Sequence, residues 1–178
     1  MEDYYPFKVS HVLASVEDMD SFFVPGSFDI IIYTSSIEHM QKKVGEVSLS
    51  HCLSLLKTDG TLFLSCPNTT EKKDPYDTQY AAHLYEWSLD ELLSALKKLG
   101  FRIKDVFGLV AKVRDFERFV SSLSENERKT YVRMKQYFPT PWLMAIFPIL
   151  YPEAASEVLI LAAKPAPKTT IKRRTLLF

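Results

Sequence analysis

Glycine is scarce in this sequence. The 178 residues contain five glycines, and no two of them are close enough to form a Gly-x-Gly turn. Turns of that kind let the backbone approach a bound nucleotide-type ligand closely. The sequence therefore holds no glycine-rich binding loop. The five glycines stand at positions 26, 45, 60, 100 and 108.

Cysteine is also rare, since Cys52 and Cys66 are the only two. Cys52 falls in a helical pattern and Cys66 in a strand pattern, which favours two buried thiols in a reducing compartment over a disulfide. The segment 1–6 has neither a basic region nor an apolar core, so it lacks the pattern of a signal peptide. We therefore expect a cytoplasmic protein.

Net charge is absent, because 22 Lys and Arg residues balance 22 Asp and Glu residues. No overall field therefore favours nucleic acid or an anionic membrane. The basic residues at 172–174 are few and terminal, which is typical of a solvated tail. The apolar run 142–151 is far shorter than the about 20 residues that cross a bilayer, and its prolines argue against a membrane-surface helix. We expect no nucleic-acid partner and no membrane span.

The most informative segment that is present runs from Ser27 to Met40. Asp29 enters a continuous apolar run, which then gives way to Thr34, Ser35 and Ser36 and to an Ile-Glu-His step at 37–39. A run that is apolar on both faces suits a parallel strand covered by helices on either side. The hydroxyl residues and the Glu-His pair then fall at the carboxyl end of the strand, where open α/β sheets bind ligands.

Other segments show clear helix and strand patterns. Ser88 with Glu91 forms a capping-box pattern, and Gly100 suits the left-handed position after that helix. Ser124 with Glu127 forms a second capping-box pattern within an inserted helical region. We expect strands at 11–16, 28–33, 61–66, 101–112 and 157–164, helices at 44–56 and 88–99, a turn at 58–60 and a polar loop at 67–87.

This order of elements resembles the carboxyl-terminal half of the class I S-adenosylmethionine-dependent methyltransferases. The motifs that carry the resemblance are Gly-Ser-Phe-Asp-Ile-Ile at 26–31, Ile-Glu-His at 37–39, the segment 56–65, the segment 83–92 with Leu-Gly-Phe at 99–101, and the segment 152–165. The resemblance implies an α/β fold with an incomplete Rossmann-like methyltransferase sheet. Such a sheet is mostly parallel, with its last strand antiparallel and helices on both faces. It implies one partial domain over 1–165 with a helical insertion at about 113–152. The segment 166–178 shows no clear pattern, and we expect it to be a flexible basic tail.

The resemblance also implies a function. The enzyme would transfer a methyl group from S-adenosyl-L-methionine to a small-molecule or sugar-type acceptor and release S-adenosyl-L-homocysteine. The glycine-rich turn of the family's first strand and the ribose-binding acid of its second strand have no counterpart here. A non-catalytic relative, either a pseudoenzyme or an interaction subunit, is therefore the alternative.

The missing strands would also leave the strand at 28–33 at the edge of the sheet. Either the amino-terminal segment fills that place, or a homodimer partner or second chain does, or the polypeptide is a fragment. The sequence does not choose among these three.

The resemblance implies roles for particular residues. Glu17, Asp18 and Met19 are candidates for the adenine side of the cofactor, and Thr34, Ser35, Ser36 and His39 for the strand end beside it. His39 is also the candidate base for the acceptor. Tyr76, Tyr80, His83 and Trp87 are candidates for substrate contact.

Each of these residues also has a structural interpretation. Asp18 can be a solvated acid in a turn, and His39 can order the start of a helix. The aromatic residues and His83 can cap the core. His51 is interpreted as structural, Cys66 has no evident base partner, and no residue is assigned as a metal ligand.

Overall fold

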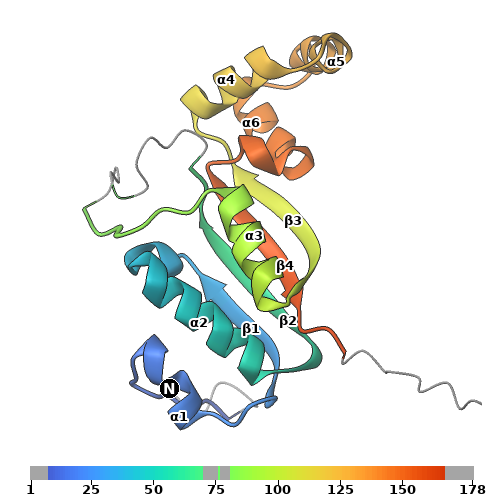
Figure 1. Ribbon diagram of the computed structural model, residues 1–178. Coiled ribbons are helices and arrows are strands. Elements are labelled where there is room, and N and C mark those ends of the chain that lie inside the picture. The colour runs from blue at the N-terminus through green and yellow to red at the C-terminus, as the bar shows by residue number, and fades with distance from the viewer. Residues whose placement is uncertain (1–7, 70–75, 77–80, 167–178) are drawn as a thin grey trace, which may run out of the picture.

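The computed structural model describes residues 8–69, 76 and 81–166, shown in Figure 1. Four strands form one sheet in the spatial order β1-β2-β4-β3. β1 runs parallel to β2, whereas β4 is antiparallel to both β2 and β3. The predicted α/β class and the antiparallel last strand are confirmed. The strands are β1 (Phe28–Thr34), β2 (Leu56–Pro67), β3 (Arg102–Val110) and β4 (Glu157–Ala163).

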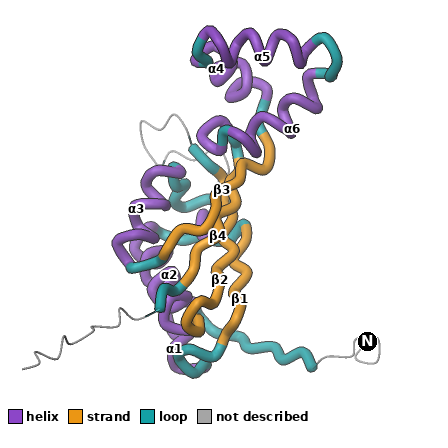
Figure 2. The backbone as a smooth tube through the Cα atoms, turned by 90° about the vertical axis from the view of Figure 1, so that its right-hand side faces the viewer, coloured by secondary structure: helices purple, strands orange, loops and turns teal. Residues whose placement is uncertain are grey.

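Two helices connect the strands and cover the sheet. α2 (Lys42–Leu55) joins β1 to β2, and α3 (Leu89–Leu99) precedes β3. Figure 2 shows both helices on the same face of the sheet. Both connections advance across the sheet in the same direction, and right-handed crossovers in one direction place their helices on one face. The structure therefore differs from the expected cover on both faces.

The covered face holds the main core. Ile31, Leu62 and Ala162 are aligned across β1, β2 and β4 and pack under α2 and α3. Cys52 and Cys66 belong to this core and are not paired in a disulfide, as predicted. The remaining fully buried members include Leu49, Leu56, Leu64, Trp87, Leu92, Leu96 and Ile160.

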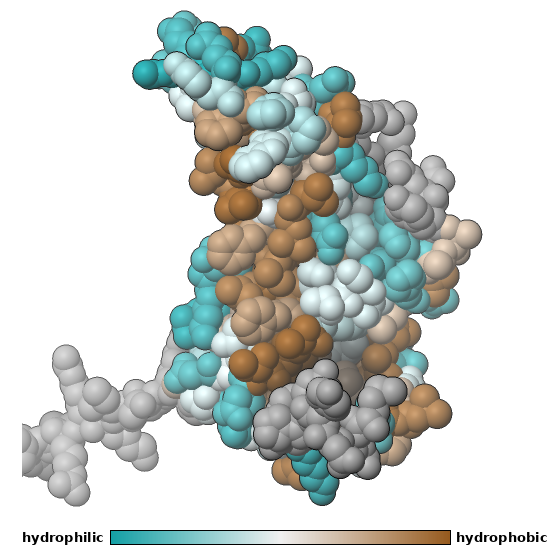
Figure 3. All heavy atoms as spheres, turned by 180° about the vertical axis from the view of Figure 1, so that it is seen from behind, coloured by the Kyte–Doolittle hydropathy of each residue, from teal (hydrophilic) through white to brown (hydrophobic). Residues whose placement is uncertain are grey.

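The opposite face of the sheet is open over much of its area. Ile30 and Ile32 of β1 are 56% and 73% exposed, and Figure 3 shows a hydrophobic band over the sheet on this side. β1 is also the edge strand, as expected from the missing neighbours. The predicted strand at 11–16 does not form, and Leu13 is fully exposed. Ser15 instead caps a short 3-10 helix at Val16–Asp18, which leads into α1 (Met19–Phe22).

The helical insertion has a small core of its own. It contains α4 (Val113–Ser122), α5 (Glu125–Lys135) and α6 (Thr140–Leu150), which pack around Phe116, Tyr131 and Phe147. The capping box at the start of α5 forms as predicted, since the Ser124 hydroxyl accepts the Glu127 N–H and the Glu127 side chain accepts the Ser124 N–H. The apolar run 142–151 thus forms most of α6, and no helix among the described residues is long and apolar enough to cross a membrane.

Two predicted boundaries change in the structure. The turn expected at 58–60 lies inside β2, which begins directly after α2 and is irregular there, with Asp59 at φ 60°. Ser88 accepts the backbone N–H of Glu91, but the Glu91 side chain binds Lys42 and Tyr85. Gly100 is left-handed at φ 107°, as predicted. Most of the tail expected at 166–178 lies outside the described residues.

Candidate functional site

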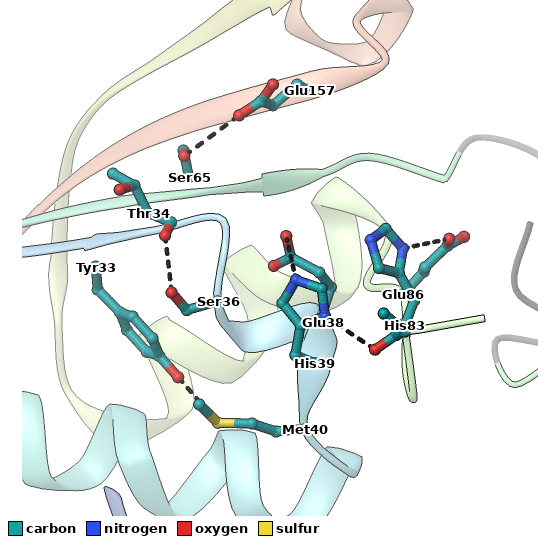
Figure 4. A network of polar contacts seen from close by, with 11 residues as sticks. Tyr33, Thr34, Ser36, Glu38, His39, Met40, Ser65, His83, Glu86 and Glu157 are labelled. Atoms are coloured by element: carbon teal, nitrogen blue, oxygen red, sulfur yellow. Dashed lines mark hydrogen bonds and ion pairs between the residues drawn. The ribbon is translucent and has the colours of Figure 1, made fainter. Parts of the chain in front are cut away.

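The carboxyl ends of β1 and β2 meet at one edge of the sheet, as Figure 4 shows. Ser35 leaves β1 with a left-handed backbone at φ 45°, and its N–H donates to the Ser65 carbonyl at 3.0 Å. The Ser36 hydroxyl donates to the Thr34 carbonyl at 2.8 Å. These bonds turn the chain sharply across the sheet edge and into a 3-10 helix at Ile37–His39. The hydroxyl residues therefore shape the turn as well as line the edge.

Glu38 is the middle residue of this 3-10 helix and is only 2% exposed. Its backbone carbonyl accepts the N–H groups of Leu84 and Tyr85, at 2.8 and 3.2 Å. The Glu38 backbone thus holds the segment before α3 against the end of β1. Its side-chain Oε1 lies 3.9 Å from His39 Nε2, whereas its Oε2 is buried with no hydrogen-bond partner among the described residues. An unpaired buried carboxylate oxygen is costly.

Two histidines come together beside Glu38. The rings of His39 and His83 are 5.1 Å apart and nearly perpendicular. His39 Nδ1 lies 2.9 Å from the Ala82 carbonyl, and His83 Nδ1 lies 2.8 Å from Glu86 Oε1. A carbonyl and a carboxylate only accept hydrogen bonds, so each Nδ1 carries a proton. In a neutral ring the lone pair is then on Nε2.

Glu38, His39 and His83 also satisfy the distance condition for a metal site. One ligand atom from each lies within 4.8 Å of the others. The sequence alone does not reveal this cluster, because a helix and a strand separate His83 from His39 and the return of His83 to the site depends on the fold. Two hollows of the described chain lie in the helical insertion, and neither is lined by a residue of this cluster.

The residues predicted for the adenine side lie elsewhere. Glu17 and Asp18 are exposed, and the Glu17 carbonyl lies 3.1 Å from His51 Nε2. His51 is on the third turn of α2, roughly 13 Å along the helix axis from its start at about 1.5 Å per residue. His39 precedes that start, so the structure does not bring Asp18 and His39 into one hollow.

The reason is packing, because Met19 is held against the main core beside the last turns of α2. The prediction that Glu17, Asp18 and Met19 share a crevice with His39 therefore loses its geometric basis. The interpretation of His51 as structural fits its bond to the Glu17 carbonyl.

The predicted aromatic residues separate into core and surface. Trp87 is 1% exposed and packs on Tyr85 in the core, so it supports the site from behind and does not form a pocket wall. Tyr76 is 61% exposed and contacts Tyr85 edge-on. His83 is beside His39, and Tyr80 lies outside the described residues.

A polar network missed by the sequence analysis joins α2 to α3 behind the site. Lys42 Nζ donates to Glu91 Oε1 at 2.5 Å, and the Tyr85 hydroxyl donates to the same oxygen. Burial alone would raise the pKa of Glu91, but the hydrogen bonds from Lys42 and Tyr85 outweigh it and lower that pKa. Burial and the bond to Glu91 raise the pKa of Tyr85 to about 12. Glu91 is therefore a structural anion and Tyr85 a neutral donor.

Other titratable groups near the strand ends are also unsuited to proton transfer near neutral pH. Burial raises the pKa of Tyr33 to about 12, and its hydroxyl lies 2.9 Å from Ser48 Oγ. Burial raises the pKa of the Cys52 thiol to about 12 as well. A side chain with such a pKa stays protonated at neutral pH. The imidazoles of His39 and His83 stay candidate bases at this edge, next to the carboxylates of Glu38 and Glu86.

A search of solved structures finds similar folds over most of the chain. A putative methyltransferase from Bacillus halodurans C-125 is 17% identical with a TM-score of 0.53, covering 89% of this chain and 78% of its own. A SAM dependent methyltransferase from Archaeoglobus fulgidus is 17% identical with a TM-score of 0.54, and the match covers 86% of this chain and 66% of that one. The (4+2)-cyclase SpnF is 19% identical with a TM-score of 0.50, covering 82% and 52%.

The chain has the class I methyltransferase fold. The three identities are too low to show more than the fold, and the cyclase is a reminder that one fold carries several chemistries. The chain spans 66% and 52% of the length of the last two structures. No protein-family model matches the sequence, and no curated protein matches it.

Proposed function

We propose that this chain forms one side of an S-adenosylmethionine-dependent methyltransferase site and acts in methyl transfer to a small-molecule or sugar-type acceptor. The observation that carries the proposal is the sheet, in which the antiparallel β4 lies between β2 and β3. The proposal is supported by the similarity of the fold to two methyltransferases, which match 89% and 86% of this chain. The polar turn after β1 is at the edge where such sheets bind ligands.

The cofactor fits the described residues in part. Thr34, Ser35 and Ser36 turn across the sheet edge and would line one side of the ligand, with His39 next to them. The glycine turn and the ribose-binding acid that the family would supply have no counterpart among the described residues. S-adenosylmethionine, when bound, supplies a methyl group on a positively charged sulfur.

The chain's own contribution to catalysis would be orientation and proton acceptance. Methyl transfer depends mainly on alignment of the acceptor with the methyl group. His39 is anchored through Nδ1 to the Ala82 carbonyl, which leaves Nε2 to take a proton from a hydroxyl or amine acceptor. His83 packs against His39, and Tyr76 packs against Tyr85, so both rings would be available to contact an acceptor bound next to His39.

The other side of the site would come from a further segment beside β1. A second copy of the chain or another chain that pairs with β1 would cover the exposed Ile30 and Ile32 and complete the edge. The alternative function is a methyltransferase-like subunit without catalysis. The absent glycine turn and the separation of Asp18 from His39 favour that alternative.

Calorimetric titration of the full chain with S-adenosylhomocysteine separates the two functions. The titration contains a chelator, so that metal binding plays no part. A methyltransferase site predicts saturable heat, with about fivefold to tenfold weaker binding in His39→Ala, equivalent to about 1 to 1.4 kcal/mol. His11→Ala removes an exposed histidine outside the site and is the matched control. No heat at millimolar ligand would contradict cofactor binding by this chain on its own and favour the non-catalytic alternative.

A further inference from the structure

The cluster of Glu38, His39 and His83 has a chemistry that the methyltransferase fold does not require. Two imidazoles and one carboxylate converge from two segments, the 3-10 helix after β1 and the stretch before α3, as Figure 4 shows. We propose that these three side chains bind one divalent transition-metal ion of the Zn²⁺ class. The proposal does not rest on methyl transfer. While the ion is bound, His39 Nε2 would hold the metal and would not take a proton from a methyl acceptor.

The hydrogen bonds of both histidines prepare them as ligands. His39 donates its Nδ1–H to the Ala82 carbonyl, and His83 donates its Nδ1–H to Glu86. Metal-binding histidines usually donate one ring N–H to a carbonyl or carboxylate, which orients the other nitrogen toward the metal. The pair His83–Glu86 has the form of a carboxylate–histidine–metal arrangement, with both side chains mostly buried at 11% and 8% exposure.

Glu38 supplies an independent observation. Only 2% of this residue is exposed, and its side-chain Oε2 has no hydrogen-bond partner among the described residues. A carboxylate buried in this way is unfavourable unless a cation or donor pairs with it. Its Oε1 already faces His39 Nε2 at 3.9 Å. A bound cation would therefore satisfy the one buried anionic group of the cluster.

The spacing fits an ion after a small contraction. Bonds of about 2.0 to 2.2 Å in a tetrahedral site place ligand atoms about 3.4 Å apart. The three ligand atoms here lie within 4.8 Å of one another, so each needs to move by roughly an ångström or less. The His39 side chain is 45% exposed and can make this adjustment by rotating about its own bonds.

The donor set selects the kind of ion. Two imidazole nitrogens and one carboxylate suit Zn²⁺ and other transition metals, whereas Mg²⁺ and Ca²⁺ prefer sites made of oxygen. Three protein ligands also leave at least one coordination position for water or for an oxygen of a small molecule. Cys52 and Cys66 are 3% and 1% exposed, so they do not compete for the ion in the folded chain.

The test is a titration of the full chain with Zn²⁺ alone, after removal of metals with a chelator. We expect one equivalent to bind. His39→Ala and His83→Ala should each weaken binding at least about tenfold, since each removes a ligand. Glu86→Gln should weaken it about 10- to 100-fold, because Glu86 orients a ligand without contacting the ion. His11→Ala should bind as the wild-type chain does.

Two results would overturn the proposal. One is no binding to the wild-type chain, in which case the two histidines serve only to order the segment before α3. The other is binding that survives unchanged in both His39→Ala and His83→Ala, which would be adventitious. Far-UV circular dichroism excludes unfolding as the cause of a loss, and Co²⁺ gives a second measurement. Its visible absorption should appear in the wild-type chain and in His11→Ala, and it should be absent from His39→Ala.

Discussion

At the scale of single residues, the contact among Lys42, Glu91 and Tyr85 joins α2 to α3 behind the candidate site. Glu91→Gln removes the charge and should lower the free energy of unfolding by about 1 to 2 kcal/mol, since charge-assisted hydrogen bonds are the stronger ones. The measurement is urea unfolding.

Glu125→Gln is the matched control for that substitution. The side chains of Lys129 and Glu125 form an ion pair and are 69% and 83% exposed. This pair should contribute less than about 0.5 kcal/mol to the free energy of unfolding. Equal losses from the two substitutions would contradict the role given to Glu91.

The same network predicts a dependence of stability on pH. The pKa of Glu91 in the folded chain lies below its ordinary value of 4.5. The unfolded carboxyl therefore binds a proton at a higher pH than the folded one. The contribution of Glu91 to the free energy of unfolding is complete above the unfolded pKa of about 4.5. It is lost as the pH falls through the folded pKa. The difference in free energy of unfolding between wild type and Glu91→Gln should thus shrink on acidification. A difference that stays constant with pH would contradict a stabilising role for ionised Glu91.

The residues of the site were only partly predictable. The position of His39 at the end of a strand follows from the apolar run before it, because strand ends are marked by local sequence. The approach of His83 depends on the path of a long loop, which local patterns do not specify. The end of α2 against which the acidic turn at 17–18 packs was not predictable, since such a turn looks the same in sequence at either end.

At the scale of elements, the insertion is attached to the sheet where α6 crosses β3. A Cβ added at Gly108 would lie 2.3 Å from the Pro148 carbonyl oxygen and 2.6 Å from Ala155 Cβ. Gly108→Ala should therefore cost about 2 to 3 kcal/mol and separate α6 from β3. Hydrogen exchange at the Ala111 amide, which donates to the Met144 carbonyl, should become faster.

Gly26→Ala is the control for Gly108→Ala. Gly26 is left-handed at φ 69°, but nothing lies within 4 Å of an added Cβ. The substitution strains the backbone by about 1 kcal/mol and leaves α6 in place. Exchange at the Ala111 amide should be unchanged. Protection of that amide in Gly108→Ala equal to wild type would show that α6 does not depend on this close approach.

Elements with strong local signals were predicted well. The apolar run of β1, the Ser124 capping box and Gly100 after α3 each form as expected. The strand expected at 11–16 does not form. A short apolar segment becomes a strand only where a neighbouring strand pairs with it through backbone hydrogen bonds. Helices do not cover both faces of the sheet in the described chain. The connections from β1 to β2 and from β2 to β3 advance across the sheet in the same direction, which places α2 and α3 on one face.

At the scale of the whole molecule, one edge and one face of the sheet lack cover in the described chain. Ile32 is 73% exposed on β1, the edge strand. An exposed apolar edge promotes pairing with another chain, and a lysine there opposes it. If a homodimer covers β1, the wild-type chain should associate as its concentration rises. Ile32→Lys should remain monomeric, with its stability unchanged within about 0.5 kcal/mol.

Light scattering after size exclusion measures this association. Val132→Lys is the matched control, because Val132 is 52% exposed but lies on α5, away from the edge. It should associate as the wild-type chain does. A wild-type chain that is monomeric at every concentration would contradict the homodimer and leave a different chain as the partner of β1.

The central claim is that the polar turn after β1 binds the adenosyl cofactor. Chemical-shift mapping of the ¹⁵N-labelled chain with S-adenosylhomocysteine tests it most directly. The account predicts saturable shifts of the amides at 34–39, with those of α5 (Glu125–Lys135) unmoved as an internal reference. Amides at 34–39 that stay in place at saturating or millimolar ligand would contradict it.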